Sequence, residues 1–263
     1  MSILLSGDFH ANAEGELGAI TKKSLIKKYG REKYYGIQCH IILGDAGFMW
    51  PNNHKTDLFH YKTLACRPFP VLCVVGNHEP ILGMNDVPEA DIGIGETVYQ
   101  IHDVPFIGYL KRGRVYTIDG VKFLVLGGAL SVDKDDRKPN KTWWQKEYWT
   151  AQEKQDVLKM LENDNTFDCV ISHTGPHHIN KILFESLTHF SEKLNDEVSF
   201  LNDEIYKKIE FREWWCGHWH KNRYYFDTET KHGYQYLYKA TKTLEKTDYG
   251  LITVYNENAS EQR

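Results

Sequence analysis

Five short motifs hold most of the residues that could do chemistry, and each follows an apolar run. In chain order they read GDFH, GDAG, GNHE, SHTG and GHWH. Glycine precedes the polar residues in four of them, where it permits a sharp, close backbone turn at the end of a strand. Alternate residues of an extended segment point to the same side. The candidate site residues are Asp8, His10, Asp45, Asn77, His78, Glu79, His173, His218 and His220.

Taken singly, each motif is ambiguous, because a Gly-Asp pair is usually a turn and an H-x-H pair is often a surface feature. Five such motifs, each at a predicted strand end, are hard to explain structurally. Carboxylate, imidazole and amide ligands without thiolates suit Mn²⁺, Fe, Zn²⁺, Co²⁺ or Ni²⁺, whereas structural zinc sites prefer closed Cys and His sets. We therefore expect a catalytic metal site. The other histidines, expected to be surface or internally bonded, include His54, His60, His102, His189 and His232.

The first ninety residues alternate strand and helix patterns. Strands are predicted at 3–6, 38–43 and 71–75, and helices at 16–29 and 55–65, with Gly30 as a helix stop. A β-α-β-α-β order is typical of a largely parallel sheet. Ligands bind at the carboxyl ends of the strands in such sheets, which is where the first three motifs lie.

The rest of the chain reads as short strands with two helical regions. Asp119-Gly120 between two strands is a hairpin signal. We find no repeat, low-complexity segment or linker, so residues 1–263 are predicted to form a single domain. Helices are expected at 150–163 and within a polar insertion at 177–210. Strands are expected at 98–102, 106–110, 114–118, 122–126, 167–172, 213–216, 223–226, 234–237 and 249–255.

From Asp8 to His220 the sequence resembles the calcineurin-like metallophosphoesterases, a superfamily of binuclear-metal phosphohydrolases. The resemblance implies an α/β fold, a four-layer αββα sandwich with two mixed β-sheets flanked by helices. It also implies two divalent metal ions, with Mn²⁺ preferred and Fe, Zn, Ni, Co or Mg as alternatives. By motif, Asp8, His10 and His220 would hold one ion, Asn77, His173 and His218 the other, and Asp45 would bridge both.

The chemistry of such a centre agrees with a phosphoester hydrolase. Two adjacent metals clamp an in-line phosphoryl displacement, and a bridging water becomes a hydroxide near neutral pH. The resemblance places His78 at the substrate, where it would protonate or stabilise the leaving oxygen. Glu79 would orient His78 or raise its pKa. Equally, it could only support a neighbouring group or start a helix.

The substrate is less determined than the reaction. Protein phosphatases of the superfamily are expected to follow the second motif with Asp-Arg-Gly, and here it reads GDAGFMW. Asn12 and Arg137 are candidate phosphate contacts, as is Asn77. The tryptophans of 127–149 could stack a base or simply pack this connection. The basic stretch 110–116 could bind substrate or be a solvated face, and His177 and His178 could line the cleft or cap a helix.

We therefore expect a small phosphodiester or nucleotide-type substrate. The alternatives are a phosphomonoesterase (protein phosphatase-like or nucleotidase), a nuclease, and a non-catalytic scaffold of the same fold. A net charge of −4 argues against binding long nucleic acid. No apolar run of membrane-spanning length and no signal peptide appear, and the five cysteines contain no C-x-x-C, so we expect a cytoplasmic protein with buried thiols. The sequence indicates no oligomeric state.

Overall fold

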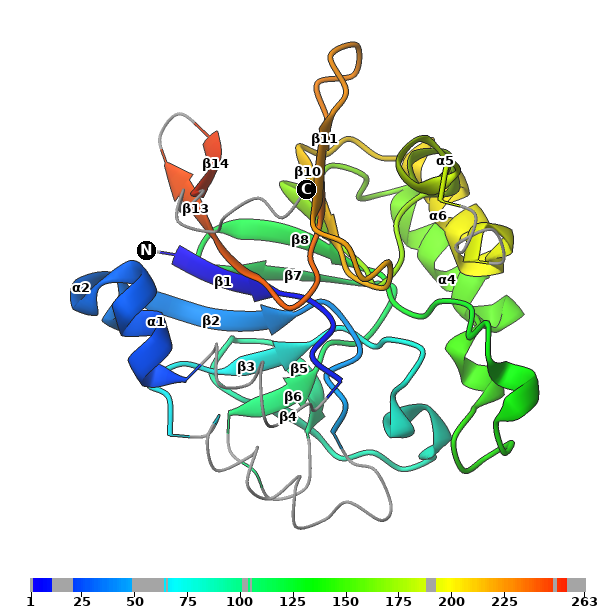
Figure 1. Cartoon of the computed structure of the whole chain (residues 1–263), viewed down its shortest axis with the longest axis horizontal. Coiled ribbons are helices and arrows are strands. Elements are labelled where there is room, and N and C mark those ends of the chain that lie inside the picture. The colour runs from blue at the N-terminus through cyan, green and yellow to red at the C-terminus, as the bar shows by residue number, and fades with distance from the viewer. Residues whose placement is uncertain are drawn as a thin grey trace.

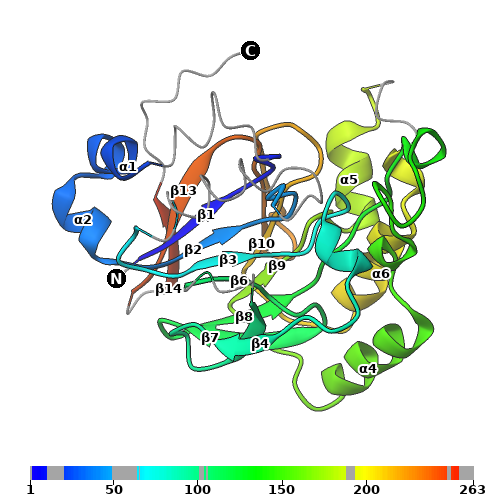
Figure 2. The same cartoon turned by 90° about the horizontal axis from the view of Figure 1, so that it is seen from below.

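In the computed structural model, two β-sheets pack face to face between two layers of helices (Figures 1 and 2). The structure describes residues 2–10, 21–48, 64, 66–100, 104, 106–187, 193–247 and 250–254, with the side chains of 251–254 excepted. This arrangement is the predicted αββα sandwich. Among the described residues, no helix is long and apolar enough to cross a membrane.

The first sheet has eight strands in the order β14-β13-β1-β2-β3-β6-β5-β4. β1, β2, β3 and β6 run parallel, and antiparallel strands complete both edges. The strands are β1 (Ser2–Ser6), β2 (Ile37–Ile42), β3 (Val71–Cys73), β4 (Glu89–Asp91), β5 (Thr97–Gln100), β6 (Ile107–Tyr109), β13 (Thr241–Thr247) and β14 (Gly250–Val254).

The second sheet has six strands in the order β11-β12-β10-β9-β8-β7. β8, β9, β10 and β12 are parallel, while β7 and β11 are antiparallel edge strands. The predicted hairpin joins β7 to β8, with φ of 51° at Asp119 and 73° at Gly120. The strands are β7 (Arg114–Ile118), β8 (Val121–Val125), β9 (Cys169–Ile171), β10 (Glu213–Cys216), β11 (Arg223–Phe226) and β12 (Gly233–Tyr236).

The helices cover the outer faces of the two sheets, as Figure 2 shows. On the first sheet, Leu25 and Tyr34 pack with Leu4, Ile37 and Phe69. On the second sheet, a larger cluster joins the helices to the outward side chains of β8, β9 and β10. The helices are α1 (Lys22–Tyr29), α2 (Arg31–Tyr35), α4 (Ala151–Leu161), α5 (His177–Phe184) and α6 (Glu197–Tyr206).

Strand alternation explains the core between the sheets. Ile3 and Leu5 of β1 point inward, opposite Phe123 and Val125 of β8, while Leu4 points outward to the helices. Burying each large apolar side chain is worth about 1.5–3 kcal/mol, so this inner layer holds the two sheets at one spacing. The cysteines are free; the four in or beside strands are buried, as predicted, and Cys66 is exposed.

Most predicted elements are present, and the differences have simple causes. α1 ends at Gly30, which has φ of 88°, as predicted, but begins at Lys22 after its cap Thr21. Residues 11–20 and almost all of the predicted helix 55–65 lie outside the described residues. The pattern missed β13, because TKTLEKT has a single large apolar residue, although the strand sits between β14 and β1. It also missed β4, a three-residue polar edge strand.

Candidate metal centre

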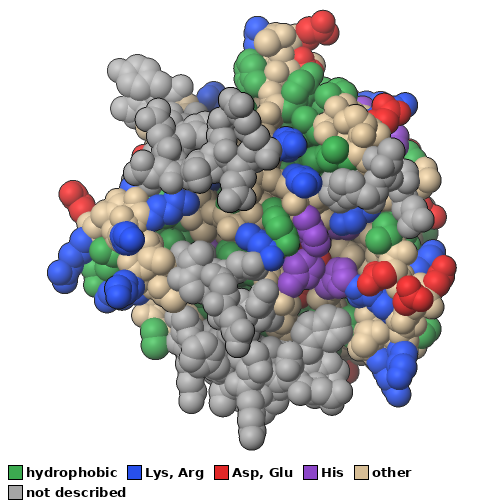
Figure 3. All heavy atoms as spheres, in the orientation of Figure 1, with side chains coloured by type: hydrophobic (Ala, Val, Ile, Leu, Met, Phe, Trp, Pro, Cys, Tyr) green, Lys and Arg blue, Asp and Glu red, His purple; other side chains and the backbone are tan. Residues whose placement is uncertain are grey.

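The five motifs meet at one edge of the sandwich. Asp8, Asp45 and Asn77 follow β1, β2 and β3, which are parallel neighbours, so the chain leaves all three at the same edge. His173 and His218 follow β9 and β10, a parallel pair of the second sheet. Figure 3 shows a patch of histidine side chains near the centre of one face, beside lysine and arginine side chains.

The donor atoms of these residues point at one another. Three overlapping groups each place their ligand atoms within 4.8 Å of one another: Asp8 with His10 and His220, His10 with Asp45 and His78, and Asp8 with Asp45 and His173. The closest approaches are 2.9 Å between His173 Nε2 and Asn77 Oδ1, 3.2 Å between the Nε2 atoms of His10 and His220, and 3.4 Å between His173 Nε2 and Asp45 Oδ2.

Five of these residues adopt left-handed backbone conformations, which are rare for side chains other than glycine. Each such residue costs on the order of 1–3 kcal/mol and persists only where its surroundings over-determine it. Turning the chain so sharply at a strand end aims the side chain across the sheet edge instead of along it. The φ values are 49° at Asp8, 48° at His10, 48° at Asp45, 65° at His218 and 51° at His220.

Two of the motif glycines are required by close packing within the centre. A Cβ on Gly44 would lie 2.2 Å from His173 Nδ1, and a Cβ on Gly76 would lie 2.1 Å from Asp45 Oδ1. Real Cβ atoms do not approach other atoms so closely, so any larger residue at either position would displace a site side chain. The two glycines, which the sequence predicts to permit sharp turns, therefore also leave room for side chains of the neighbouring motifs.

The charges at the centre are buried and incompletely satisfied. Both Asp8 oxygens are buried without a hydrogen-bond partner among the described residues, and burial raises the pKa of Asp8 to about 7. Burial opposes charge on His173, but Asp45 raises the pKa of that imidazole to about 9. Burial also disfavours charge on Asp45, yet His173 and His78 hold its pKa well below the usual range. A carboxylate buried without partners is costly unless a cation completes it.

The imidazole ring nitrogens are arranged as a metal site requires. His173 Nδ1 lies 2.9 Å from the Leu43 carbonyl oxygen and donates to it, so Nε2, which faces Asn77 Oδ1 and Asp45, is the nitrogen that would bind a metal ion on losing its proton. His218 Nε2 is buried and has no described partner, and burial holds the pKa of His218 well below its usual range. A neutral imidazole with an unused lone pair is what a divalent cation needs. The donor set therefore fits divalent metal ions.

A buried chain of hydrogen bonds orients Asn77. Its Nδ2 donates to Ser131 Oγ at 2.9 Å, and Ser131 Oγ donates to Glu147 Oε2 at 2.7 Å. With the amide nitrogen occupied, Oδ1 is the atom turned to His173. The sequence noted Ser131 only as part of a suggestive loop and missed Glu147, which is buried although its neighbours in sequence are polar.

Glu79 supports the turn after β2. Its Oε1 accepts from the Ala46 N–H at 2.8 Å and its Oε2 accepts from the Tyr109 hydroxyl at 2.6 Å. Burial raises the pKa of Glu79 to about 8. Both oxygens are therefore engaged by groups other than His78, and the geometry favours the supporting role over the orienting role.

His78 faces the same hollow as His10, with ring centroids 5.3 Å apart. Arg137 Nη2 lies 2.9 Å from His78 Nε2, and Arg137 also pairs with Asp133 at 2.8 Å. Burial lowers the pKa of His78 to about 4, although Asp45 acts in the opposite sense. Of the candidate phosphate contacts, Arg137 is thus brought to the site, while Asn12 lies outside the described residues.

Lys193 was missed by the sequence and reaches the centre from the polar insertion. Its Nζ donates to the His218 carbonyl oxygen at 2.8 Å, and its charge counters the burial that raises the pKa of Asp8. Burial lowers the pKa of Lys193. No local pattern singles out one lysine of a polar helical region, so only the packing of the insertion reveals it.

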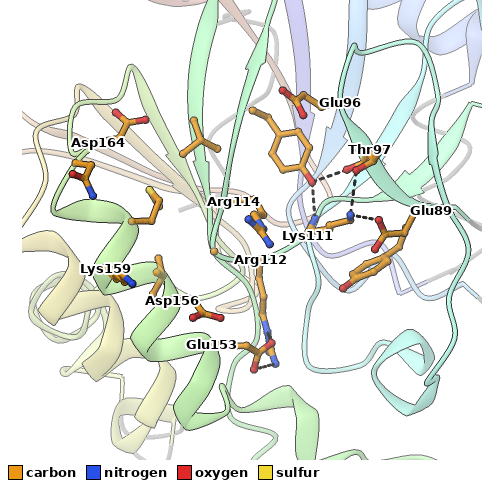
Figure 4. A pocket seen from close by; sticks show the side chains of 17 residues that line it. Glu89, Glu96, Thr97, Lys111, Arg112, Arg114, Glu153, Asp156, Lys159 and Asp164 are labelled. Carbon is orange, nitrogen blue, oxygen red and sulfur yellow. Dashed lines mark hydrogen bonds and ion pairs between the residues drawn. The ribbon is translucent and has the colours of Figure 1, made fainter.

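Other candidate residues lie elsewhere. His178 pairs with Asp203 at 2.5 Å and joins α5 to α6, while Trp144 and Trp149 pack into hydrophobic clusters. The basic stretch 110–116 lines a separate groove of about 1050 Å³, shown in Figure 4, which includes none of the described metal-site candidates. There Lys111 pairs with Glu89, and Arg112 with Glu153.

Comparison with known proteins agrees with this architecture. A family model described as calcineurin-like phosphoesterase matches residues 1–222, and no curated protein matches. One solved structure is 12% identical, with a TM-score of 0.55, covering 96% of this chain and 98% of that one. GAP50 of Plasmodium, described as the anchor in the inner membrane complex, is 11% identical with a TM-score of 0.51, covering 96% and 83%. A putative 5'-nucleotidase from Staphylococcus aureus is 12% identical with a TM-score of 0.49, covering 96% and 52%. The two structures with TM-scores of 0.55 and 0.51 support the fold alone.

Proposed function

The chain belongs to the calcineurin-like phosphoesterase family, and we propose that it hydrolyses a small phosphodiester or nucleotide-type substrate with two divalent metal ions. One observation carries this proposal. Asp8 is buried with no described hydrogen bond to either carboxylate oxygen, and its nearest cation-binding neighbours are His173 and His220, each 3.9 Å away. Such a carboxylate destabilises the protein unless a cation is bound, so its presence among lone-pair donors argues for a metal-dependent hydrolase.

The ligand sets follow the geometry and the family resemblance together. Asp8, His10 and His220 would hold one ion, and their donor atoms cluster. Asn77, His173 and His218 would hold the other, with Asn77 oriented by Ser131 and His173 by Leu43. Asp45 lies between the two sets, 3.7 Å from His10 Nε2 and 3.4 Å from His173 Nε2. Mn²⁺ is our first choice, with Fe, Zn, Ni, Co or Mg as alternatives.

When bound, the metal ions would supply Lewis-acid activation of water and neutralise phosphate charge. The chain's own residues would do the rest. His78 would donate a proton or hydrogen bond to the leaving oxygen, and Arg137 beside it would hold a phosphate oxygen and keep the group in line. The substrate would displace the contact between Arg137 and His78. Asp133, which pairs with Arg137, would then keep the guanidinium at the site.

Further side chains would act on the substrate. Lys193 would add a buried positive charge beside the backbone of His218, which favours an anionic substrate. Asn77 and Asn12 would contribute amide contacts to the phosphate.

We also propose that residues 1–263 form a single domain, since one inner core joins both sheets.

The test compares two model substrates in a metal-stripped preparation. After removal of metals, Mn²⁺, Fe²⁺, Zn²⁺, Ni²⁺ or Mg²⁺ is added back singly, and hydrolysis of bis-p-nitrophenyl phosphate is compared with that of p-nitrophenyl phosphate. We expect metal-dependent cleavage that is faster for the diester. Faster cleavage of the monoester would contradict the diester preference and favour a phosphatase or nucleotidase.

The control is His78→Ala, measured for both turnover and metal content. We expect turnover to fall by about 10²–10⁴-fold, the usual contribution of a positioned acid, with two ions still bound by elemental analysis. Loss of metal would place His78 among the ligands instead. Two bound ions without turnover on either ester, in the unmodified protein, would favour the non-catalytic scaffold.

A further inference from the structure

The β11–β12 hairpin projects from the body of the molecule (Figure 1), and β11 is the outermost strand of its sheet as described. Natural edge strands are usually protected by shortness, charged side chains, proline, a bulge or a covering element. β11 is four residues long and reads RYYF, so its one charged side chain is Arg223; it has no proline, and it pairs with β12 in continuous register without a bulge. Tyr224 and Phe226 are exposed by 45% and 44% on one face of the strand.

The backbone of β11 has a defined outward pattern. Gly233 and Leu237 of the β12 region donate their N–H groups toward β10, so the residues between them, Tyr234 and Tyr236, turn theirs toward β11. Their partners in β11 are Tyr225 and Arg223. The bond from the Asp227 N–H to the His232 carbonyl continues the same alternation. Tyr224 and Phe226 therefore direct their N–H and C=O groups away from β12.

We propose that β11 is a homodimer interface, in which it pairs antiparallel with β11 of a second copy about a two-fold axis at Tyr225. Backbone N–H and C=O groups that point away from β12 must face the same kind of groups in the second copy. The two-fold axis can therefore pass through Tyr224, Tyr225 or Phe226. The axis at Tyr225 sets Tyr224 opposite Phe226 and Arg223 opposite Asp227. Each of these pairs occurs twice by symmetry.

This register is self-complementary in both shape and charge. Aromatic cross-strand pairs and opposite charges directly across a pair each stabilise a sheet. An axis at Tyr224 would set Arg223 opposite Tyr225 instead, and an axis at Phe226 would set Asp227 opposite Tyr225, so neither alternative pairs the two charges. The resulting contact is isologous, closes after two copies and joins the two six-stranded sheets into one.

The first test measures mass in solution by light scattering over a range of concentrations. We expect the wild type to approach twice the 30.7 kDa chain mass. Arg223→Glu sets a like charge opposite Asp227 at two places and should raise the dimer dissociation constant about ten-fold or more, while Arg223→Gln should raise it less. The proposal is overturned if the wild type remains monomeric at all concentrations, or if Arg223→Glu leaves the dimer dissociation constant unchanged.

The second test separates the edge from the side chains. Phe226→Pro removes an outward N–H without removing a bond to β12, and should abolish the dimer, whereas Phe226→Thr keeps the N–H and should only weaken it. Circular dichroism and metal-dependent hydrolysis check that each variant is folded. Equal dimerisation of the proline variant would contradict strand pairing.

The third test fixes the register by cross-linking, in a Cys66→Ser background that removes the exposed thiol. Residues 225 of the two copies should face each other as a non-hydrogen-bonded pair about 4.5 Å apart at Cα, within disulfide range. Tyr225→Cys should therefore give a covalent dimer on mild oxidation. The matched Tyr224→Cys should not, because each residue 224 faces residue 226; equal cross-linking of both variants would refute this register.

Discussion

The candidate metal centre and the groove of Figure 4 both gather charged side chains, but these charges are paired in the groove, whereas the centre leaves a buried carboxylate without a described hydrogen bond. Asp8 and Asp45 are buried on left-handed backbone, and neither Asp8 oxygen has a described hydrogen-bond partner. In the groove, Lys111 and Arg112 are paired with carboxylates near solvent. Exposed pairs are worth about 0–1 kcal/mol, whereas a buried unsatisfied charge costs much more.

The difference teaches that density of charge does not identify a site. The groove has a volume of about 1050 Å³ and contains the most basic stretch of the sequence, yet its described ion pairs satisfy their own charges. At the candidate metal centre the fold holds the Asp8 carboxylate and His218 Nε2 away from water and leaves them without a described hydrogen bond. The predictions below test this contrast, beginning with the change that should matter most.

Asp45→Asn should cause the largest loss. Asp45 lies between the two proposed ligand sets and also accepts from the His78 backbone N–H at 2.9 Å. Removing its charge should weaken both ions and lower kcat by about 10³-fold or more, since metal ions supply several kcal/mol to such transition states. Diester hydrolysis and elemental analysis measure the two effects. Near-normal turnover would exclude Asp45 from the centre.

Metal removal should have the next largest effect, this time on stability. At a free metal concentration one hundred times Kd, each ion adds about 2.7 kcal/mol, or about 5–10 °C in Tm for a chain of this size. Chelation should therefore lower the Tm measured by calorimetry.

Asp8→Asn is the informative companion to chelation. Without metal it should match or exceed the wild-type Tm, because it removes a buried carboxylate that has no described hydrogen bond. When metal is added, the Asp8→Asn protein should show much less of the rise in Tm that metal gives the wild type. A chelated Asp8→Asn protein that is far less stable than the chelated wild type would mean that Asp8 has a structural role.

Ser131→Ala should have an intermediate effect. It removes the hydroxyl that holds the Asn77 amide in place and is itself held by Glu147. Groups that orient metal ligands typically contribute 10–100-fold in metal affinity or activity. Titrating metal into the hydrolysis assay should show about a 10–100-fold loss in metal affinity or activity for Ser131→Ala. Ser131→Thr, which keeps the hydroxyl, should show a smaller loss. Unchanged activation would mean that Asn77 is oriented by its other contacts.

Lys111→Met should have the smallest effect. It breaks an ion pair with the half-exposed Glu89 in the groove, so we expect a loss of no more than about 1 kcal/mol in the free energy of unfolding by urea. Hydrolysis should stay within about two-fold of the wild type. A large loss of turnover would make the groove part of the functional site and would break the contrast between the two regions.

Some of these features were predictable from local chemistry alone. The Asp119-Gly120 turn, the stop at Gly30 and the strands with continuous apolar runs follow from backbone preferences and periodicity, which act over a few residues. β13 could not be predicted in this way, because its burial comes from lying between two strands and not from its own residues. The exposure of Cys66 similarly depends on what packs around it.

By itself, the sequence determined the types and order of the candidate ligands and the glycines beside them, while the family resemblance implied the fold class. The ligands and glycines are local properties, since a metal needs particular donor atoms and a strand end needs a residue that can turn. Only the tertiary structure decided which side chains complete and support the set. Ser131 and Glu147 hold Asn77, Glu79 holds the turn after Asp45, and Lys193 arrives from a separate insertion. Their roles depend on contacts between segments far apart in the chain, which no local pattern encodes.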